Sequence, residues 1–164
     1  MTGKSRTAVL FVVLTLGACS DEPQAAAPAP LTTQPASPEA PCVTKIVTDA
    51  LPEWARTGFS GDGSGNPHVF SKNGDMVGVL FGNPLTAPPA ADHNNKILWV
   101  SKLPINTPSD FAIVAKLAGT GETVQPKVDQ APGPSIIDMP RAGCWRFTLT
   151  WSGHVDTMDL TYSS

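Results

Sequence analysis

The chain has 164 residues, of which 41% are hydrophobic and 15% charged, with 11 Lys plus Arg against 14 Asp plus Glu. The net charge is −3, and no basic patch or stripe appears along the sequence. We therefore expect no nucleic acid partner.

The first 18 residues have the three parts of a secretory signal. Lys4 and Arg6 supply positive charge, residues 8–16 form a short apolar run, and small residues follow. The run is shorter than the ~20 apolar residues of a membrane-spanning helix. The segment Leu16-Gly17-Ala18-Cys19 resembles the lipobox of bacterial lipoproteins. That family is lipidated on the cysteine and cleaved before it, so the resemblance implies that Cys19 becomes the lipidated first residue.

The lipobox predicts a protein attached by acyl chains, such as palmitate, to the cell membrane or cell envelope, on its extracytoplasmic side. Ordinary secretion with a free Cys19 is the alternative. Cleavage removes Lys4 and Arg6, which leaves nine basic and fourteen acidic residues, a net charge of −5 (9 − 14). Residues 19–41 are rich in Pro and Ala and predict a disordered tether. A ligand for a Pro-recognising domain is another interpretation of this tract.

Residues 42–164 remain as one domain, with Cys42 at its start and Cys144 near its end. Such a pair in an exported protein is usually a disulfide. The bridge would close a loop of about a hundred residues, worth up to ~4.7 kcal/mol in the chain-entropy model. Two separate buried thiols are the alternative. The cysteines lack the CxxC spacing of redox-active or metal-binding pairs.

Pro and Gly interrupt this domain at short intervals, which indicates many short strands. A helix of at most two turns is expected at 49–56, with Asp49 as its cap and Pro52 in its first turn. The dipeptide Asn73-Gly74 favours a hairpin turn. The expected strands are, in chain order, 68–71, 76–81, 97–101, 111–117, 122–128, 135–139, 144–151 and a last strand that includes 158–162. Strand 76–81 is apolar on both faces and predicts a central position.

Two of these strands alternate between apolar and polar residues, as half-buried antiparallel strands do. In 144–151 the side chains of Trp145, Phe147, Leu149 and Trp151 share one face, and Arg146, Thr148 and Thr150 share the other. In the last strand Met158, Leu160 and Tyr162 are expected to face inward, and Asp159 and Thr161 outward. The dipeptide Ser152-Gly153 turns the chain between them.

About seven or eight short strands in a domain of ~120 residues predict an all-β fold, a β-sandwich. The segment 140–145 (PRAGCW), followed by a strand, a turn and a final strand, resembles the closing hairpin of bacterial immunoglobulin-like domains. The resemblance covers the last thirty residues or so and implies an immunoglobulin-like antiparallel β-sandwich. Cys144 lies on the face opposite Trp145. A Cys42–Cys144 bridge is therefore expected to join the N-terminal arm to the outer face or edge of the sheet.

The chain as a whole resembles uncharacterised actinobacterial lipoproteins. The motifs that carry this resemblance are Asn94-Asn95-Lys96-Ile97-Leu98-Trp99 and the stretch from Pro132-Gly133-Pro134-Ser135 to Trp151-Ser152-Gly153-His154. The resemblance implies no particular activity.

Candidate residues for chemistry are few. Nucleophilic catalysis needs a nucleophile beside a histidine and an acid, and His68, His93 and His154 each lie near an expected turn or loop. The segment 152–157 is expected to be a hairpin loop that connects two strands. It has the densest polar character, and a binding role for it is the alternative, with His154 and Asp156 as the candidate binding residues. The loop 82–96 around His93 is longer than most sandwich connections, which marks it as functional or mobile.

Two metal sites come into question. Residues 62–66 (DGSGN) have oxygen ligands at alternate positions, but Pro67 replaces the glycine of an EF-hand, so only a looser calcium site remains. Copper proteins of the envelope use His and Met. The copper candidates are His68, Met76, His93, Met139, His154 and Met158. These residues are scattered, and the three methionines are also expected in the core.

The leading hypothesis is a non-enzymatic binding or structural domain without a cofactor, anchored in the envelope by lipid. Its partner would be another envelope protein or a cell-wall component. A metal-binding lipoprotein is the second hypothesis and a hydrolase the third. A binding module should show an exposed apolar or loop-rich patch. A metal protein should bring at least three of the named His and Met residues together.

Overall fold

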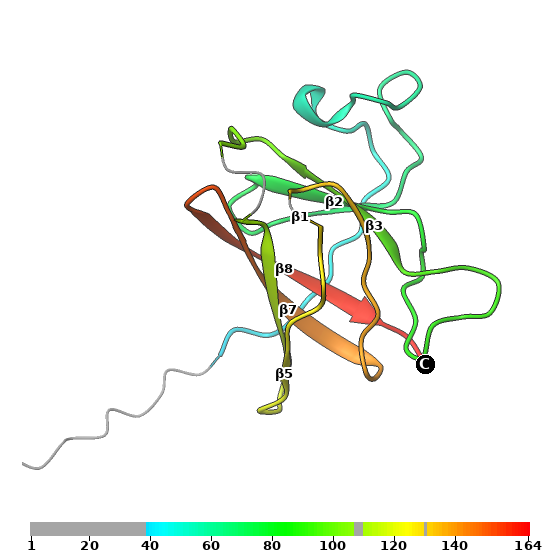
Figure 1. Cartoon of the computed structure of the whole chain (residues 1–164). Coiled ribbons are helices and arrows are strands. Elements are labelled where there is room, and N and C mark those ends of the chain that lie inside the picture. The colour runs from blue at the N-terminus through cyan, green and yellow to red at the C-terminus, as the bar shows by residue number, and fades with distance from the viewer. Residues whose placement is uncertain (1–38, 107–109, 130) are drawn as a thin grey trace, which may run out of the picture. The chain divides into compact units, whose positions relative to one another are not determined.

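A computed structural model describes residues 39–106, 110–129 and 131–164. The predicted signal peptide, Cys19 and nearly all of the predicted tether lie outside these residues. The described part is all-β, with two antiparallel sheets of four strands each and one short 3₁₀ helix, η1 (Figure 1). The predicted β-sandwich architecture agrees with these two layers.

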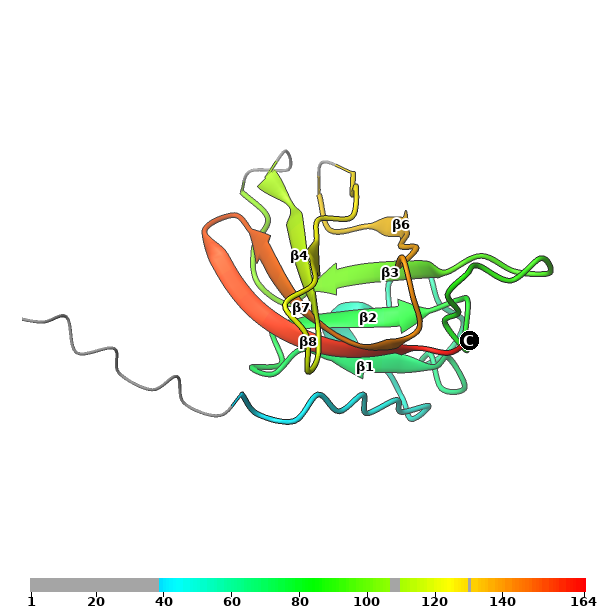
Figure 2. The ribbon, with the colours of Figure 1, turned by 90° about the horizontal axis from the view of Figure 1, so that it is seen from below.

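The two sheets are built from strands that are far apart in sequence. The first sheet has, in spatial order, β1 (His68–Phe70), β2 (Met76–Leu80), β3 (Lys96–Ser101) and β6 (Pro134–Ile136). The second sheet has, in spatial order, β5 (Thr123–Val124), β4 (Ala112–Leu117), β7 (Gly143–Trp151) and β8 (His154–Tyr162). In Figure 2 strands β2 and β3 lie horizontally, and β4, which belongs to the other sheet, runs crosswise to them.

The main core lies between the sheets. On β7 every second side chain from Trp145 to Trp151 is buried, and on β8 Met158, Leu160 and Tyr162 are buried, as the alternation predicts. From the first sheet, Met76, Leu80 and Trp99 join the same core. The Tyr162 hydroxyl donates a hydrogen bond to the Ile137 carbonyl (2.8 Å), and burial raises its pKa far above the usual value. The methionines Met76, Met139 and Met158 are core residues.

The central strand β2 is buried on both faces, as predicted. Its Val77 and Val79 form a second cluster with Leu51 and Ala55, which cover the outer face of the first sheet. The helix there is shorter than expected: η1 spans only Glu53–Ala55, and Pro52 precedes it without a side-chain cap. Asp49 does not cap it, because η1 begins at Glu53 and the N-cap position is occupied by Pro52, three residues after Asp49.

Three strands differ from the expectation by more than one residue. Strand β5 has two residues instead of the predicted 122–128, since Pro126 has no N–H to extend the ladder. Strand β6 ends at Ile136. Strand β8 begins at His154, because Ser152 (φ 43°) and Gly153 (φ 77°) alone make the turn. Two successive residues with positive φ form the tight hairpin that matches the twist of its strands.

Candidate functional site

The N-terminal arm, residues 39–47, is bonded to the outer face of the second sheet. Cys42 forms a disulfide with Cys144 of β7, with the two Cα atoms 6.0 Å apart. This confirms the expected bridge and its place on the face opposite Trp145. Beyond Cys42, the Val43 N–H donates to Asp159 Oδ2 (3.0 Å), and the hydroxyls of Thr44 and Thr161 lie 2.8 Å apart.

The arm then crosses to the first sheet. Val47 pairs with His68 through two backbone hydrogen bonds of 2.9 Å. The arm thus connects β8, the edge of one sheet, to β1, the edge of the other. Apart from this arm, a bond from the Lys72 N–H to the Thr157 carbonyl (2.7 Å) also joins the two edges.

An ionic cluster holds the start of the arm. Arg146 donates to both carboxylate oxygens of Asp159, at 2.8 and 2.9 Å, and to the Pro41 carbonyl at 3.2 Å. The hydrogen bond to Asp159 raises the pKa of the Arg146 guanidinium. Lys116 donates to Glu39 (2.8 Å), and this bond lowers the pKa of the Glu39 carboxyl. Residues 39–41, which the sequence assigns to the tether, therefore contact the folded domain.

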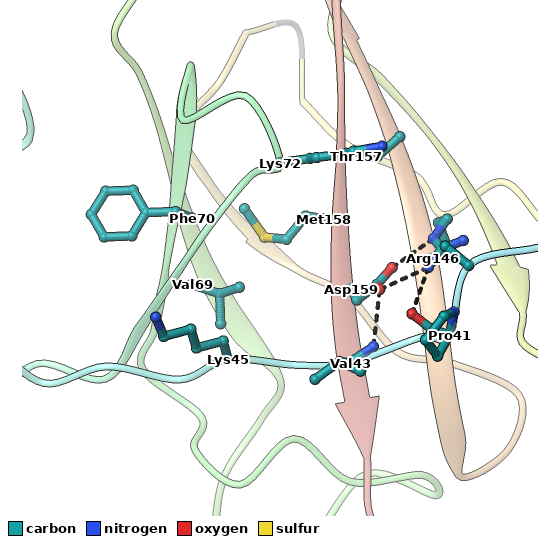
Figure 3. A pocket seen from close by; sticks show the side chains of 11 residues that line it. Pro41, Val43, Lys45, Val69, Phe70, Lys72, Arg146, Thr157, Met158 and Asp159 are labelled. Carbon is teal, nitrogen blue, oxygen red and sulfur yellow. Dashed lines mark hydrogen bonds and ion pairs between the residues drawn. The ribbon is translucent and has the colours of Figure 1, made fainter.

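A cavity of about 410 Å³, here called the arm pocket, lies between the arm and the edge strands β1 and β8. Its lining residues are Ala40, Pro41, Val43, Lys45, Val69, Phe70, Lys72, Arg146, Thr157, Met158 and Asp159. Figure 3 shows Val69 and Met158 between the side chains of Lys45 and Lys72, with the Arg146–Asp159 pair beside the arm. Val69 and Met158 belong to the main core, so the floor of this pocket is the open edge of the sandwich.

A second hollow lies on the outer face of the first sheet. This aromatic groove, about 480 Å³, is lined by Thr57, Gly58, Phe59, Ser60, Ser64, Asn66, Phe81 and Leu98. The rings of Phe59 and Phe81 are stacked, with centroids 6.2 Å apart, and Phe81 is 50% exposed. The Lys96 ammonium lies 5.5 Å from the Phe81 ring centroid. Ile136, 53% exposed, pairs with Lys96 across the β3–β6 ladder and extends the apolar surface.

The two candidates His154 and Asp156 lie in β8 and not in a hairpin loop: the turn is at Ser152-Gly153, as expected, but the loop does not extend to Thr157. Asp156 is buried (3% exposed). Its carboxylate accepts hydrogen bonds from the Asn73 N–H (3.1 and 3.2 Å), the Thr157 N–H (2.7 Å) and the Asp75 N–H (3.5 Å). His154 contacts the Trp151 ring, with centroids 5.6 Å apart. Asp156 therefore holds the β1–β2 turn against β8.

His68 is fully buried on β1, and its Nδ1 lies 2.8 Å from the Asn66 carbonyl, to which it donates. Its ring meets Phe70 edge-on, with centroids 5.2 Å apart. This histidine fastens the segment before β1 to the sheet.

His93 lies in the long loop before β3. Its Nδ1 is 2.9 Å from Asp92 Oδ1 and its Nε2 is 3.0 Å from the Pro84 carbonyl. Both partners are acceptors, so the imidazolium can donate to each, and the Pro84 carbonyl and the Asp92 carboxylate raise the pKa of His93. Asn95 also fixes the loop: it accepts from the Thr86 N–H (2.9 Å) and donates to the Thr86 carbonyl (2.8 Å).

In the described residues no three His, Cys, Asp or Glu side chains lie together in a way that would hold a metal ion. Asp62, the first residue of the proposed calcium loop, accepts from the Ser64 N–H (3.0 Å) and the Ser64 hydroxyl (2.6 Å), which lowers the pKa of its carboxyl. These bonds make residues 62–64 a compact turn. Of the copper candidates, the three methionines are in the core.

No protein family model, curated protein or solved structure matches this chain. Among the described residues, no helix has the length and apolar character needed to cross a membrane.

Sequence reasoning missed the residues that form both hollows. Lys45, Lys72 and Arg146 are up to a hundred positions apart, and only the arm brings them to one pocket. Phe59 was not placed in any element, and Phe81 was assigned to a buried central strand. One signal was present: Phe81 directly precedes Gly82, where the apolar run ends and the long loop begins.

Proposed function

We propose that the protein is a lipoprotein of the cell envelope, held to the membrane by acyl chains on Cys19 and facing the extracytoplasmic side. Its β-sandwich acts as a binding or structural domain without catalytic activity, and its partner is another envelope protein or a wall component. The observation that carries this proposal is the covalent attachment of the arm. A pull from an N-terminal anchor reaches the domain through residues 39–42 and passes into β7 through the Cys42–Cys144 bond, so the contacts of Val43 and Thr44 with β8 do not bear it.

The disulfide also supports export, since such bonds persist in oxidising compartments outside the cytoplasm. The polar residues that the sequence offered for catalysis support a non-enzymatic role. Asp156, His93 and the Nδ1 of His68 hold turns and loops through hydrogen bonds to the backbone. The aromatic groove supports a binding role, because an exposed apolar surface beside polar loops is typical of recognition sites.

We further propose that the sandwich is immunoglobulin-like. Trp145, at the start of the penultimate strand, is fully buried and donates its indole N–H to the Arg141 carbonyl (3.1 Å), which fits the closing hairpin of such domains. An experimental structure superposed on immunoglobulin-like domains of known topology tests this idea. A different strand order in the two sheets would contradict it.

Labelling with an alkyne analogue of palmitate tests the anchor. The full chain is expressed in a bacterium that processes lipoproteins, and membrane and medium fractions are compared. We expect label on the wild-type chain in the membrane, and none on Cys19→Ala. The matched control is the double variant Cys42→Ser/Cys144→Ser, which loses the other two cysteines and should stay labelled. Unlabelled wild-type protein in the medium, or a labelled Cys19→Ala variant, would refute the anchor.

A further inference from the structure

We propose that the arm pocket binds the headgroup of an anionic phospholipid, so that this face of the domain rests on the membrane that holds the anchor. The proposal names a ligand for a specific site. It rests on the proposed function only for the identity of the nearby membrane, and the chemistry of the pocket stands independently of it.

The pocket is locally cationic in a chain that is acidic overall. Its lining carries Lys45, Lys72 and Arg146 against the single carboxylate of Asp159, a formal charge of +2 (3 − 1). That carboxylate is already occupied by Arg146 and by the Val43 N–H. Within the described residues, Lys45 and Lys72 form no ion pair, so both ammonium groups are available. Lysine ammonium groups are common point-charge ligands of phosphate.

Part of the pocket lining is apolar and could contact the glycerol backbone of a phospholipid. Val69 and Met158 form its floor between the two lysines (Figure 3). Two further lining side chains are apolar and exposed: Val43 is 65% exposed and Phe70 is 41% exposed. A free phosphate ion would gain nothing from these side chains. A phospholipid headgroup with its glycerol backbone matches both the ammonium groups and the apolar surface.

The position of the arm argues for a membrane rather than a distant partner. The chain enters the described domain at Glu39, next to the lining residues Ala40 and Pro41. Cys19 is 20 residues before Glu39, a reach of at most ~72 Å at 3.6 Å per residue. The part of the domain nearest to the anchor along the chain is therefore the pocket itself. A tethered surface meets its target at a high effective concentration, so weak headgroup binding is sufficient.

The net charge of the chain restricts binding to an anionic membrane to the arm pocket. The mature chain has a net charge of −5, from nine basic and fourteen acidic residues, so an anionic membrane repels the molecule as a whole. Binding to such a membrane then requires the local cluster of the arm pocket. It should weaken as salt screens the attraction, because the Debye length falls to ~10 Å at 0.1 M salt.

Vesicle co-sedimentation of the mature chain, residues 19–164 with Cys19→Ser, tests the pocket without any lipid anchor. The vesicles contain phosphatidylcholine alone or phosphatidylcholine with phosphatidylglycerol. We expect pelleting only with the anionic vesicles, and a several-fold loss for Lys45→Gln/Lys72→Gln. The matched control Lys102→Gln/Lys127→Gln removes the same charge from two exposed lysines outside the pocket and should still pellet.

Three results would overturn the proposal. They are no pelleting with anionic vesicles, an equal loss in both double variants, and displacement of the protein by inorganic phosphate at constant ionic strength. The last result would assign the site to a free anion. Vesicle binding and palmitate labelling are separate readouts. A labelled chain that does not bind vesicles refutes the arm pocket alone, and a chain that binds vesicles but is not labelled refutes the anchor alone.

Discussion

Both carboxylate oxygens of Asp156 accept a hydrogen bond from the same backbone N–H, that of Asn73, at 3.1 and 3.2 Å. Asp156 belongs to β8 of the second sheet, and Asn73 lies in the turn between β1 and β2 of the first. With the bond from the Lys72 N–H to Thr157, this contact closes one end of the edge where the two sheets meet.

Replacing Asp156 by Ala should lower the free energy of unfolding by about 1.5–3 kcal/mol, because it removes the charged acceptor of the Asn73, Asp75 and Thr157 N–H groups. Urea unfolding followed by tryptophan fluorescence measures the loss. Asp129→Ala is the control: Asp129 is exposed, and its replacement should change stability by less than about 0.5 kcal/mol. Equal stability of the two variants would show that Asp156 does not hold the turn.

Loss of the disulfide should destabilise the domain strongly. Cys42 and Cys144 are 102 residues apart in sequence, which predicts up to ~4.7 kcal/mol in the chain-entropy model and typically 2–5 kcal/mol for a native bond. Unfolding of Cys42→Ser/Cys144→Ser, compared with the oxidised wild type, measures the difference. Reduction of the wild type should produce the same shift. A wild type whose stability does not change on reduction would contradict a structural role for this bond.

Gly82 lies where the long loop leaves the first sheet, and it has no room for a side chain. A Cβ at this position would clash with the backbone oxygen of Asn94. Gly82→Ala should therefore cost about 1–3 kcal/mol, because the loop backbone has to shift. Gly121→Ala is its control, since no atom lies within 4 Å of a Cβ there. Thermal unfolding of both variants measures their difference in stability. Similar melting temperatures would show that the loop backbone shifts without a loss of stability.

The pKa of His93 should be above the usual value of about 6.5. The folded state favours the imidazolium, so its contribution to stability is present below the unfolded pKa and is lost as the pH rises through the raised folded pKa. NMR titration of the imidazole protons measures the pKa directly. Asp92→Asn should lower it by removing the carboxylate, while the Pro84 carbonyl remains. A wild-type pKa at or below about 6.5 would contradict the geometry of these two acceptors.

Much of the fold was predictable from local patterns. The alternation from Trp145 to Trp151 and the apolar run at β2 each matched a strand with the expected buried face. The signal was strong because side-chain direction in a strand repeats every two residues. The turn before β8 was harder to delimit. The polar residues from His154 to Thr157 suggested a loop, but the hairpin needs only Ser152 and Gly153, and the ladder with β7 extends to His154.

The candidate site was less predictable. Sequence reasoning selected histidines and acids by type, and it had no way to know that Asp156 faces the core edge or that His68 is buried behind the segment before β1. The sequence showed no basic patch, because the basic residues of the arm pocket are far apart along the chain. The arm brings Lys45 beside Lys72 and Arg146, which are separated by 27 and 101 positions from it (72 − 45 and 146 − 45).

By itself the sequence indicated the strand content, the Cys42–Cys144 disulfide and the face where that bond attaches, because these depend on local periodicity and on the two cysteines of the domain. The pairing of the sheets, the path of the arm and the two hollows were decided only by the tertiary structure. Such features depend on contacts between residues far apart in sequence, such as Val43 with Asp159 and Val47 with His68. The local sequence pattern of a segment does not indicate which sheet edge, formed by residues far away in the sequence, that segment will cover.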